Sequence, residues 1–170
     1  MQRSVAISIM LALGAATIAR AESPVTTPAP ANKKAPMTIR ATGTFDVKLA
    51  PLSAYNSAEE AKTGRMSIDK VFHGDLEGTS KGEMLTGMTD TKGSAGYVAI
   101  ERVTGTLNGK SGSFTLQHSG SMNRGVANLT LTVVADSATG QLSGLSGKMN
   151  IIISAGKHAY ELDYALPETP

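Results

Sequence analysis

The sequence contains no cysteine and no tryptophan among its 170 residues, and only three phenylalanines and four tyrosines. Without cysteine the chain has no disulfides, no thiol chemistry and no site for attaching a lipid to cysteine. With so few aromatic rings, the core must consist mainly of aliphatic side chains and methionine. Stability therefore has to come from packing and from backbone hydrogen bonds.

Sequence motifs for catalysis and cofactor binding are also missing. There is no G-x-S-x-G nucleophile motif, no glycine-rich phosphate loop, no dinucleotide fingerprint and no H-E-x-x-H zinc motif. The three histidines, His73, His118 and His158, are widely separated, whereas zinc sites usually include one close pair of ligands. We therefore expect neither a metal nor a cofactor.

The chain has no excess of one charge that would attract a polyanion. It contains 16 Lys and Arg against 14 Asp and Glu, and two of the bases, Arg3 and Arg20, lie in the first 21 residues. The rest of the chain therefore has as many acids as bases. This balance gives no electrostatic reason to expect nucleic acid or an anionic membrane as a partner.

The N-terminus has the pattern of a signal peptide. Arg3 precedes an uncharged apolar run over residues 5–18, and Ala19 and Ala21 place small residues where a signal peptidase cleaves. The run is too short to span a bilayer, and no second one follows, so we expect no membrane span. We expect cleavage after Ala21 and an exported protein, either periplasmic or secreted.

The remaining chain divides into three parts. Residues 22–36 contain four prolines and little to bury, which predicts a disordered spacer. Residues 37–166 form the predicted domain, and residues 167–170 a loose tail.

Within the domain, hydrophobic residues recur at every second position, which is the period of a half-buried β-strand. A short helical turn is expected over residues 57–62. Eight strands are predicted, over residues 37–49, 64–73, 75–85, 95–104, 113–121, 126–135, 146–154 and 158–166.

Eight antiparallel strands with glycine-rich turns are typical of a β-sandwich or a closed barrel. Glycines inside the strands, such as Gly43, Gly78 and Gly105, favour the sharp bends of a barrel. We predict an all-β fold, a closed eight-stranded antiparallel barrel. Its interior is either filled by side chains or holds one small ligand. The run over residues 140–147 is expected to be an irregular turn.

The dipeptide Asn108-Gly109 predicts a two-residue hairpin turn, which sets the register of the strands on either side. In this register Leu107 faces Lys110 and Ala99 faces His118. The more apolar face should point inward, and its candidate site residues are Tyr97, Glu101, Phe114, Leu116 and His118.

Glu101 and His118 lie diagonally across from each other in this register, within side-chain reach. A buried carboxylate needs a partner, so the pair is a candidate for proton transfer, with Tyr97 or Arg102 orienting a substrate. Two other interpretations stay open. A longer turn would shift the register and expose Glu101, or Glu101 forms a structural ion pair with Arg102 or a nearby lysine.

The other two hairpins are less informative about a site. The turn at residues 155–156 places Ile151 opposite Tyr160, and His158 at the barrel rim. Near His73, a turn at residues 73–74 would place Lys70 opposite Glu77, whereas a turn at residues 74–75 would place Phe72 there. In either case the set His73, Asp75 and Glu77 clusters at one barrel end, as a solvated rim or the lining of a mouth.

Several strings of residues resemble an uncharacterised bacterial family, a domain of unknown function whose solved members are small β-barrels similar in fold to allene oxide cyclase. The resemblance supports a closed barrel and transfers no catalytic residue, because no segment matches a cyclase motif. It covers about residues 39–166 and rests on GRMSI at 64–68, FHGDLEGTSKG at 72–82, GSAGY at 93–97, ERVTG at 101–105, GSF at 112–114 and QHSG at 117–120.

Three functions are compatible with the sequence. The first is a module that binds one small apolar ligand in a methionine-rich interior, with candidates Met66, Met84, Met88 and Met149. The second is a structural or interaction protein of the cell envelope, which could form a homo-oligomer. The third is an isomerase, cyclase or lyase that uses Glu101 and His118. The residues alone do not establish whether the protein is an enzyme.

Overall fold

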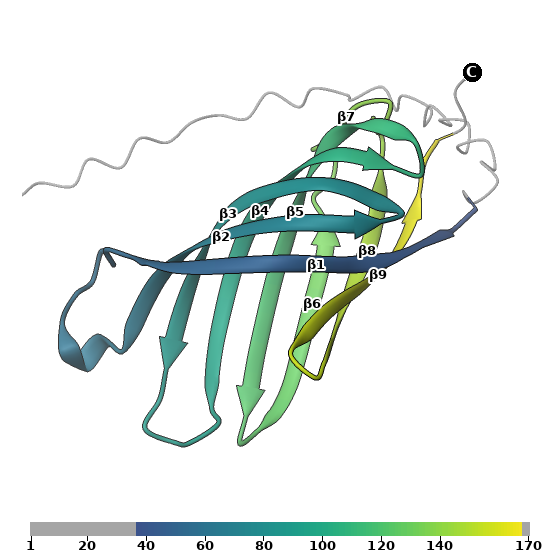
Figure 1. Cartoon of the computed structure of the whole chain (residues 1–170). Coiled ribbons are helices and arrows are strands. Elements are labelled where there is room, and N and C mark those ends of the chain that lie inside the picture. The colour runs from purple at the N-terminus through teal and green to yellow at the C-terminus, as the bar shows by residue number, and fades with distance from the viewer. Residues whose placement is uncertain (1–36, 168–170) are drawn as a thin grey trace, which may run out of the picture. The chain divides into compact units, whose positions relative to one another are not determined.

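The computed structural model describes residues 37–167 (Figure 1). The predicted signal peptide with its cleavage site at Ala21, the predicted spacer and residues 168–170 lie outside this part of the chain. The elements are β1 (Ile39–Leu52), η1 (Glu59–Ala61), β2 (Thr63–Gly74), β3 (Leu76–Met88), β4 (Ala95–Leu107), β5 (Lys110–Asn123), β6 (Val126–Val133), β7 (Thr139–Gly140), β8 (Ser146–Ser154) and β9 (Lys157–Ala165).

All eight predicted strands are present, and most run a few residues further than predicted. The short helical segment is a single 3-10 turn, η1. The two-residue strand β7 was not expected; it pairs with β5 next to Ser113. No helix in residues 37–167 combines the length and the apolar character needed to cross a membrane.

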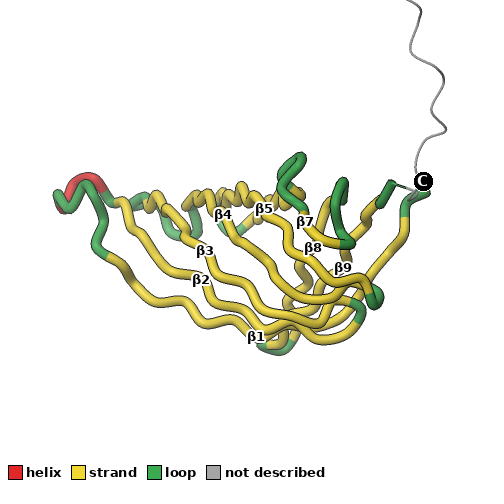
Figure 2. The backbone as a smooth tube through the Cα atoms, turned by 90° about the horizontal axis from the view of Figure 1, so that it is seen from above, coloured by secondary structure: helices red, strands yellow, loops and turns green. Residues whose placement is uncertain are grey.

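The strands close into an antiparallel barrel, as the sequence predicts. Each of β1 to β5 pairs with the next in a continuous meander, β5 pairs with β6, β6 with β8, β8 with β9, and β9 returns to β1. The strand β7 lies outside this ring of eight. Figure 2 shows the strong curvature of the sheet that this closure requires.

The barrel wall is not equally complete at both ends. β1 pairs with β9 only as far as Phe45, which lies opposite His158. Beyond it, residues 46–52 pair with β2 alone among the described strands. β6 meets β8 at one residue pair, Thr132 and Lys148. The hairpin of β8 and β9 is therefore short beside the long strands β1 to β5 (Figure 1), and one end of the barrel is open.

The register predicted from Asn108-Gly109 is confirmed. Leu107 lies opposite Lys110 and Ala99 opposite His118. Asn108 and Gly109 have φ angles of 48° and 78°, the positive values that such a tight hairpin turn requires. The predicted pairing of β8 with β9 is confirmed as well.

Neither register predicted near His73 is correct. Lys70 lies opposite Ser80, and Phe72 opposite Gly78. The connection holds one more residue than a two-residue turn allows. Its shape is fixed by contacts that strand periodicity does not reveal, since the Asp75 carboxylate accepts a hydrogen bond of 2.7 Å from the Thr42 amide of β1. Lys70 points into the barrel because it alternates in phase with the buried Ile68 and Phe72, and its cross-strand partner is Ser80.

The core fills the barrel end opposite the opening. Buried side chains of β2 to β5 and β9 pack there, among them Phe72, Leu107 and Phe114. The run over residues 140–147, expected to be an irregular turn, supplies Leu142 and Leu145, both fully buried in this core. This end of the barrel is therefore closed by packed side chains.

Tyr160 links the core to the backbone. Its hydroxyl accepts a hydrogen bond of 2.8 Å from the amide of Leu76. Gly43 leaves the space for this hydroxyl, because a Cβ at that position would lie 2.6 Å from it. Residue 43 therefore has to be glycine for the ring to keep this position.

Replacing Tyr160 with Phe should lower the free energy of unfolding by about 1–3 kcal/mol, because the buried Leu76 amide loses its partner. Chemical denaturation followed by circular dichroism measures this change. The control is Tyr55→Phe, at a tyrosine that is fully exposed. Equal stability of the two variants would show that the Tyr160 hydroxyl does not contribute.

Candidate functional site

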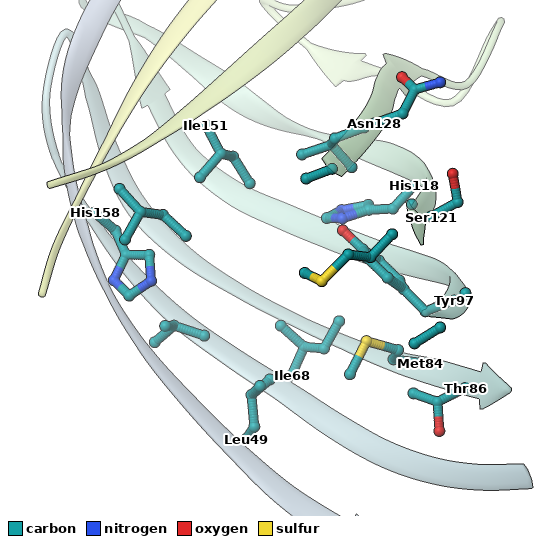
Figure 3. A pocket seen from close by; sticks show the side chains of 18 of the residues that line it. Leu49, Ile68, Met84, Thr86, Tyr97, His118, Ser121, Asn128, Ile151 and His158 are labelled. Atoms are coloured by element: carbon teal, nitrogen blue, oxygen red, sulfur yellow. The ribbon is translucent and has the colours of Figure 1, made fainter. Parts of the chain in front are cut away.

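A cavity of about 460 Å³ occupies the open half of the barrel (Figure 3). Its wall is mainly apolar and comes from strands around the whole ring, with Val47 from β1, Ile68 from β2, Met84 from β3, Leu129 from β6 and Ile151 from β8. These side chains point inward because they alternate in phase with the buried core residues toward the closed end of the same barrel. The cavity is therefore the continuation of the hydrophobic interior toward the open end of the barrel.

Tyr97 extends across this cavity because β5 carries a glycine beside it. A Cβ at Gly120 would lie 2.1 Å from Cε1 of the Tyr97 ring, so any larger residue would displace the ring. Figure 3 shows Tyr97 and His118 on the same side of the pocket that both residues line. Glycine in a strand interior often marks such a close approach.

Four polar side chains lie at the inner end of the cavity, and we call this set the floor: Lys70, Ser80, Glu101 and His118. They come from four consecutive strands, β2 to β5, and all are buried. Because neighbouring strands are staggered, the four residues form one continuous group across the barrel interior. The packed core lies on one side of the floor, toward the closed end of the barrel, and the apolar cavity lies on the other side, toward the open end.

Glu101 is the centre of the floor, with no exposed surface. The Lys70 ammonium donates a hydrogen bond of 2.7 Å to Oε2 of Glu101. The Ser80 hydroxyl donates to the other carboxylate oxygen, Oε1. His118 approaches from the cavity side, with Nε2 2.9 Å from Oε2. Its ring is turned away from the direction of a linear hydrogen bond, so this contact depends on proximity and charge.

Lys70 is held by two aromatic rings as well as by Glu101. Its ammonium nitrogen lies 4.9 Å from the centre of the Phe45 ring and 5.7 Å from that of Phe72. Both distances are within the range of cation–π attraction. A buried ammonium thus has one carboxylate and two ring faces around it, which offset the loss of its hydration.

The surroundings of Glu101 shift its pKa strongly. Burial by itself would raise the pKa, but the His118 contact, the charge and hydrogen bond of Lys70 and the Ser80 hydroxyl outweigh it and lower the pKa to about 2. Glu101 is therefore ionised at neutral pH. Burial and the negative charge of Glu101 raise the pKa of Tyr97, so its phenol keeps its proton.

The predicted site residues divide into two groups. Tyr97 and His118 line the cavity, and Glu101 lies directly behind His118. Phe114 and Leu116 are fully buried in the core and do not reach the cavity wall. The catalytic role assigned to Glu101 and His118 stays a prediction.

Two floor residues, Lys70 and Ser80, were not among the predicted site residues. The lysine of the structural ion pair left open by the sequence is Lys70, whereas Arg102 points outward and donates to the Ser137 carbonyl. The signal for Lys70 was available, because it alternates in phase with Ile68 and Phe72, both buried.

The rim candidates His73, Asp75 and Glu77 are exposed at the closed end, where β2 turns into β3, and so lie away from the cavity opening. Nδ1 of His73 lies 3.9 Å from Glu77, whose carboxylate also accepts a hydrogen bond from the Gly74 amide. These contacts stabilise a turn. Residues 37–167 contain no group of three or more His, Asp or Glu side chains placed to hold a metal ion.

The free energy of unfolding should fall by up to about 3 kcal/mol between pH 4.5 and pH 2 on account of Glu101 alone. In this window the unfolded chain, with the ordinary pKa of 4.5, takes up a proton that the folded chain excludes. Above pH 4.5 the contribution is complete and constant. Denaturation midpoints measured across this range test the expectation.

The matched control is the double variant Lys70→Met with Glu101→Gln, which removes both charges and leaves no unpaired lysine in the interior. Its stability profile should be flatter than that of the wild type between these pH values. Parallel profiles would contradict the assignment, since the remaining carboxylates are common to both proteins.

Comparison with known proteins agrees with this fold. Residues 41–164 match the family DUF3224, described as proteins of unknown function. A crystal structure of a DUF3224 protein of unknown function from Shewanella oneidensis MR-1 is 49% identical to this chain. It matches with a TM-score of 0.75, over 78% of this chain and 100% of the other.

None of the curated proteins matches the sequence. The likeness to allene oxide cyclase stays a prediction. The expectation of an uncharacterised family of small barrels is confirmed, and the chain belongs to the DUF3224 family.

Proposed function

We propose that this barrel binds one small, largely apolar molecule in its cavity. The observation that carries the proposal is an open, apolar cavity of about 460 Å³ above a buried polar floor. This volume is within the range of small-molecule sites, which are typically about 300–1,000 Å³, mostly apolar and supplied with a few polar groups.

The contrast between the two halves of the barrel supports a binding role over simple packing. In the closed half, large side chains such as Phe72, Phe114 and Leu142 fill the interior completely. In the open half the wall includes Gly96, Gly120 and Ala127, which leave space. The methionine Met84 on this wall adapts readily to the shape of a bound molecule.

The state of Glu101 favours binding over proton transfer. A general base works best when its pKa is near the working pH, whereas the pKa of Glu101 is about 2. Its oxygens are also engaged by Lys70 and Ser80. Glu101 therefore acts mainly as the counter-charge of Lys70. With the predicted signal peptide, binding would take place in the periplasm or outside the cell.

The test compares two tryptophan substitutions at adjacent positions of β3. Met84 lines the cavity, whereas Leu85 is exposed on the outer wall. Met84→Trp should fill the cavity and reduce the affinity for an apolar dye such as Nile red at least tenfold, while Leu85→Trp leaves it unchanged. Fluorescence titration measures both affinities.

Loss of dye binding in both variants, or in neither, would contradict binding in this cavity. Native mass spectrometry of the protein purified from its own host provides a second measurement. A bare polypeptide mass in every preparation, together with no dye binding by the wild type, would overturn the proposed function.

A further inference from the structure

We infer that the floor recognises a neutral carbonyl oxygen, so that the ligand is a ketone, ester or lactone with an apolar body. This inference deepens the proposed function and depends on it. It follows from which hydrogen-bonding groups of the floor are already used, which remain available, and what net charge they leave.

The acceptor capacity of the floor is taken up within the protein. Oε1 of Glu101 accepts a hydrogen bond from Ser80, and Oε2 accepts one from Lys70 and also lies next to His118. Glu101 has no exposed surface, so a molecule in the cavity does not reach it. A ligand that needs an acceptor, such as an amine, finds no free carboxylate here.

Close to Glu101, the polar groups that line the cavity include hydrogen-bond donors. Lys70, Tyr97 and His118 all line it. An ammonium has three N–H donors, and Glu101 takes one of those of Lys70. Nε2 of His118 lies 2.9 Å from Oε2 of Glu101 and is not a free donor. The Tyr97 phenol, which keeps its proton, extends over Gly120 and lies within electrostatic range of Glu101. The donors of Lys70 and Tyr97 in an otherwise apolar site favour an oxygen acceptor.

The charge balance decides which kind of acceptor fits. The positive charge of Lys70 is already cancelled by Glu101 at 2.7 Å. A carboxylate head group would add a second anion to a buried site with one cation, and an unpaired buried charge is costly. A carbonyl oxygen accepts the same hydrogen bonds without adding a charge. The floor therefore favours a neutral carbonyl over a fatty-acid anion.

The experiment measures displacement of Nile red from the wild-type protein by four molecules of similar length, in slightly alkaline buffer. They are methyl nonyl ketone, undecane, decanoate and decylamine. The ketone should bind about tenfold more tightly than undecane, as one buried hydrogen bond would give. It should also bind more tightly than decanoate and decylamine.

The outcomes separate the two proposals. If all four molecules displace the dye equally, cavity binding stands and the carbonyl inference fails. Tighter binding of decanoate or decylamine than of the ketone would also overturn the inference. If none of them displaces the dye, the proposed function fails and the inference fails with it.

The variant Tyr97→Phe removes one donor and keeps the ring over Gly120. It should weaken ketone binding several-fold and leave undecane binding unchanged, whereas the wall variant Met84→Leu should affect both molecules alike. The infrared carbonyl stretch of the bound ketone gives a readout that packing alone does not move. It should lie at lower frequency in the wild type than in Tyr97→Phe, and equal frequencies would exclude Tyr97 as a donor.

Discussion

The ion pair between Lys70 and Glu101 is the interaction on which the interior of this barrel depends. Both side chains are buried, and each charge compensates the desolvation of the other across 2.7 Å. Loss of one partner from such a pair typically costs about 3–5 kcal/mol. The pair also fixes a boundary, because side chains pack tightly on one side of it and leave a cavity on the other.

Glycines on the neighbouring strands give the polar residues their places. Gly82 lies opposite Glu101, and a Cβ there would come within 2.8 Å of the Cα of Glu101. Gly120 has the same relation to the Tyr97 ring. Small residues at two inward positions thus let long side chains lie across adjacent strands.

The sequence predicted the strands and two of the four floor residues, Glu101 and His118, because the signals for them lie close together in the chain. Alternating hydrophobicity marks each strand, and Asn108-Gly109 sets the register that brings Glu101 to His118. Lys70 was missed as the partner, although it alternates in phase with Ile68 and Phe72, because the turn near His73 was given the wrong register. The turn is also shaped by the hydrogen bond from the Thr42 amide of β1 to Asp75, a contact between residues far apart in the sequence. For the same reason Leu142 was read as part of a turn, although it plugs the barrel end.

The charge pair links the stability of the fold to the chemistry of its cavity. Lys70 alone at this depth would make the floor an anion site, and Glu101 alone would make it a cation site. Together they leave a neutral floor that still presents a donor, because Glu101 is saturated by its neighbours while Lys70 lines the cavity. The selectivity of the cavity is therefore a consequence of how the barrel compensates its own buried charges. A variant that kept only one of the two residues would leave that charge unpaired at this depth, so the same barrel would have to accept a ligand of opposite charge or lose stability.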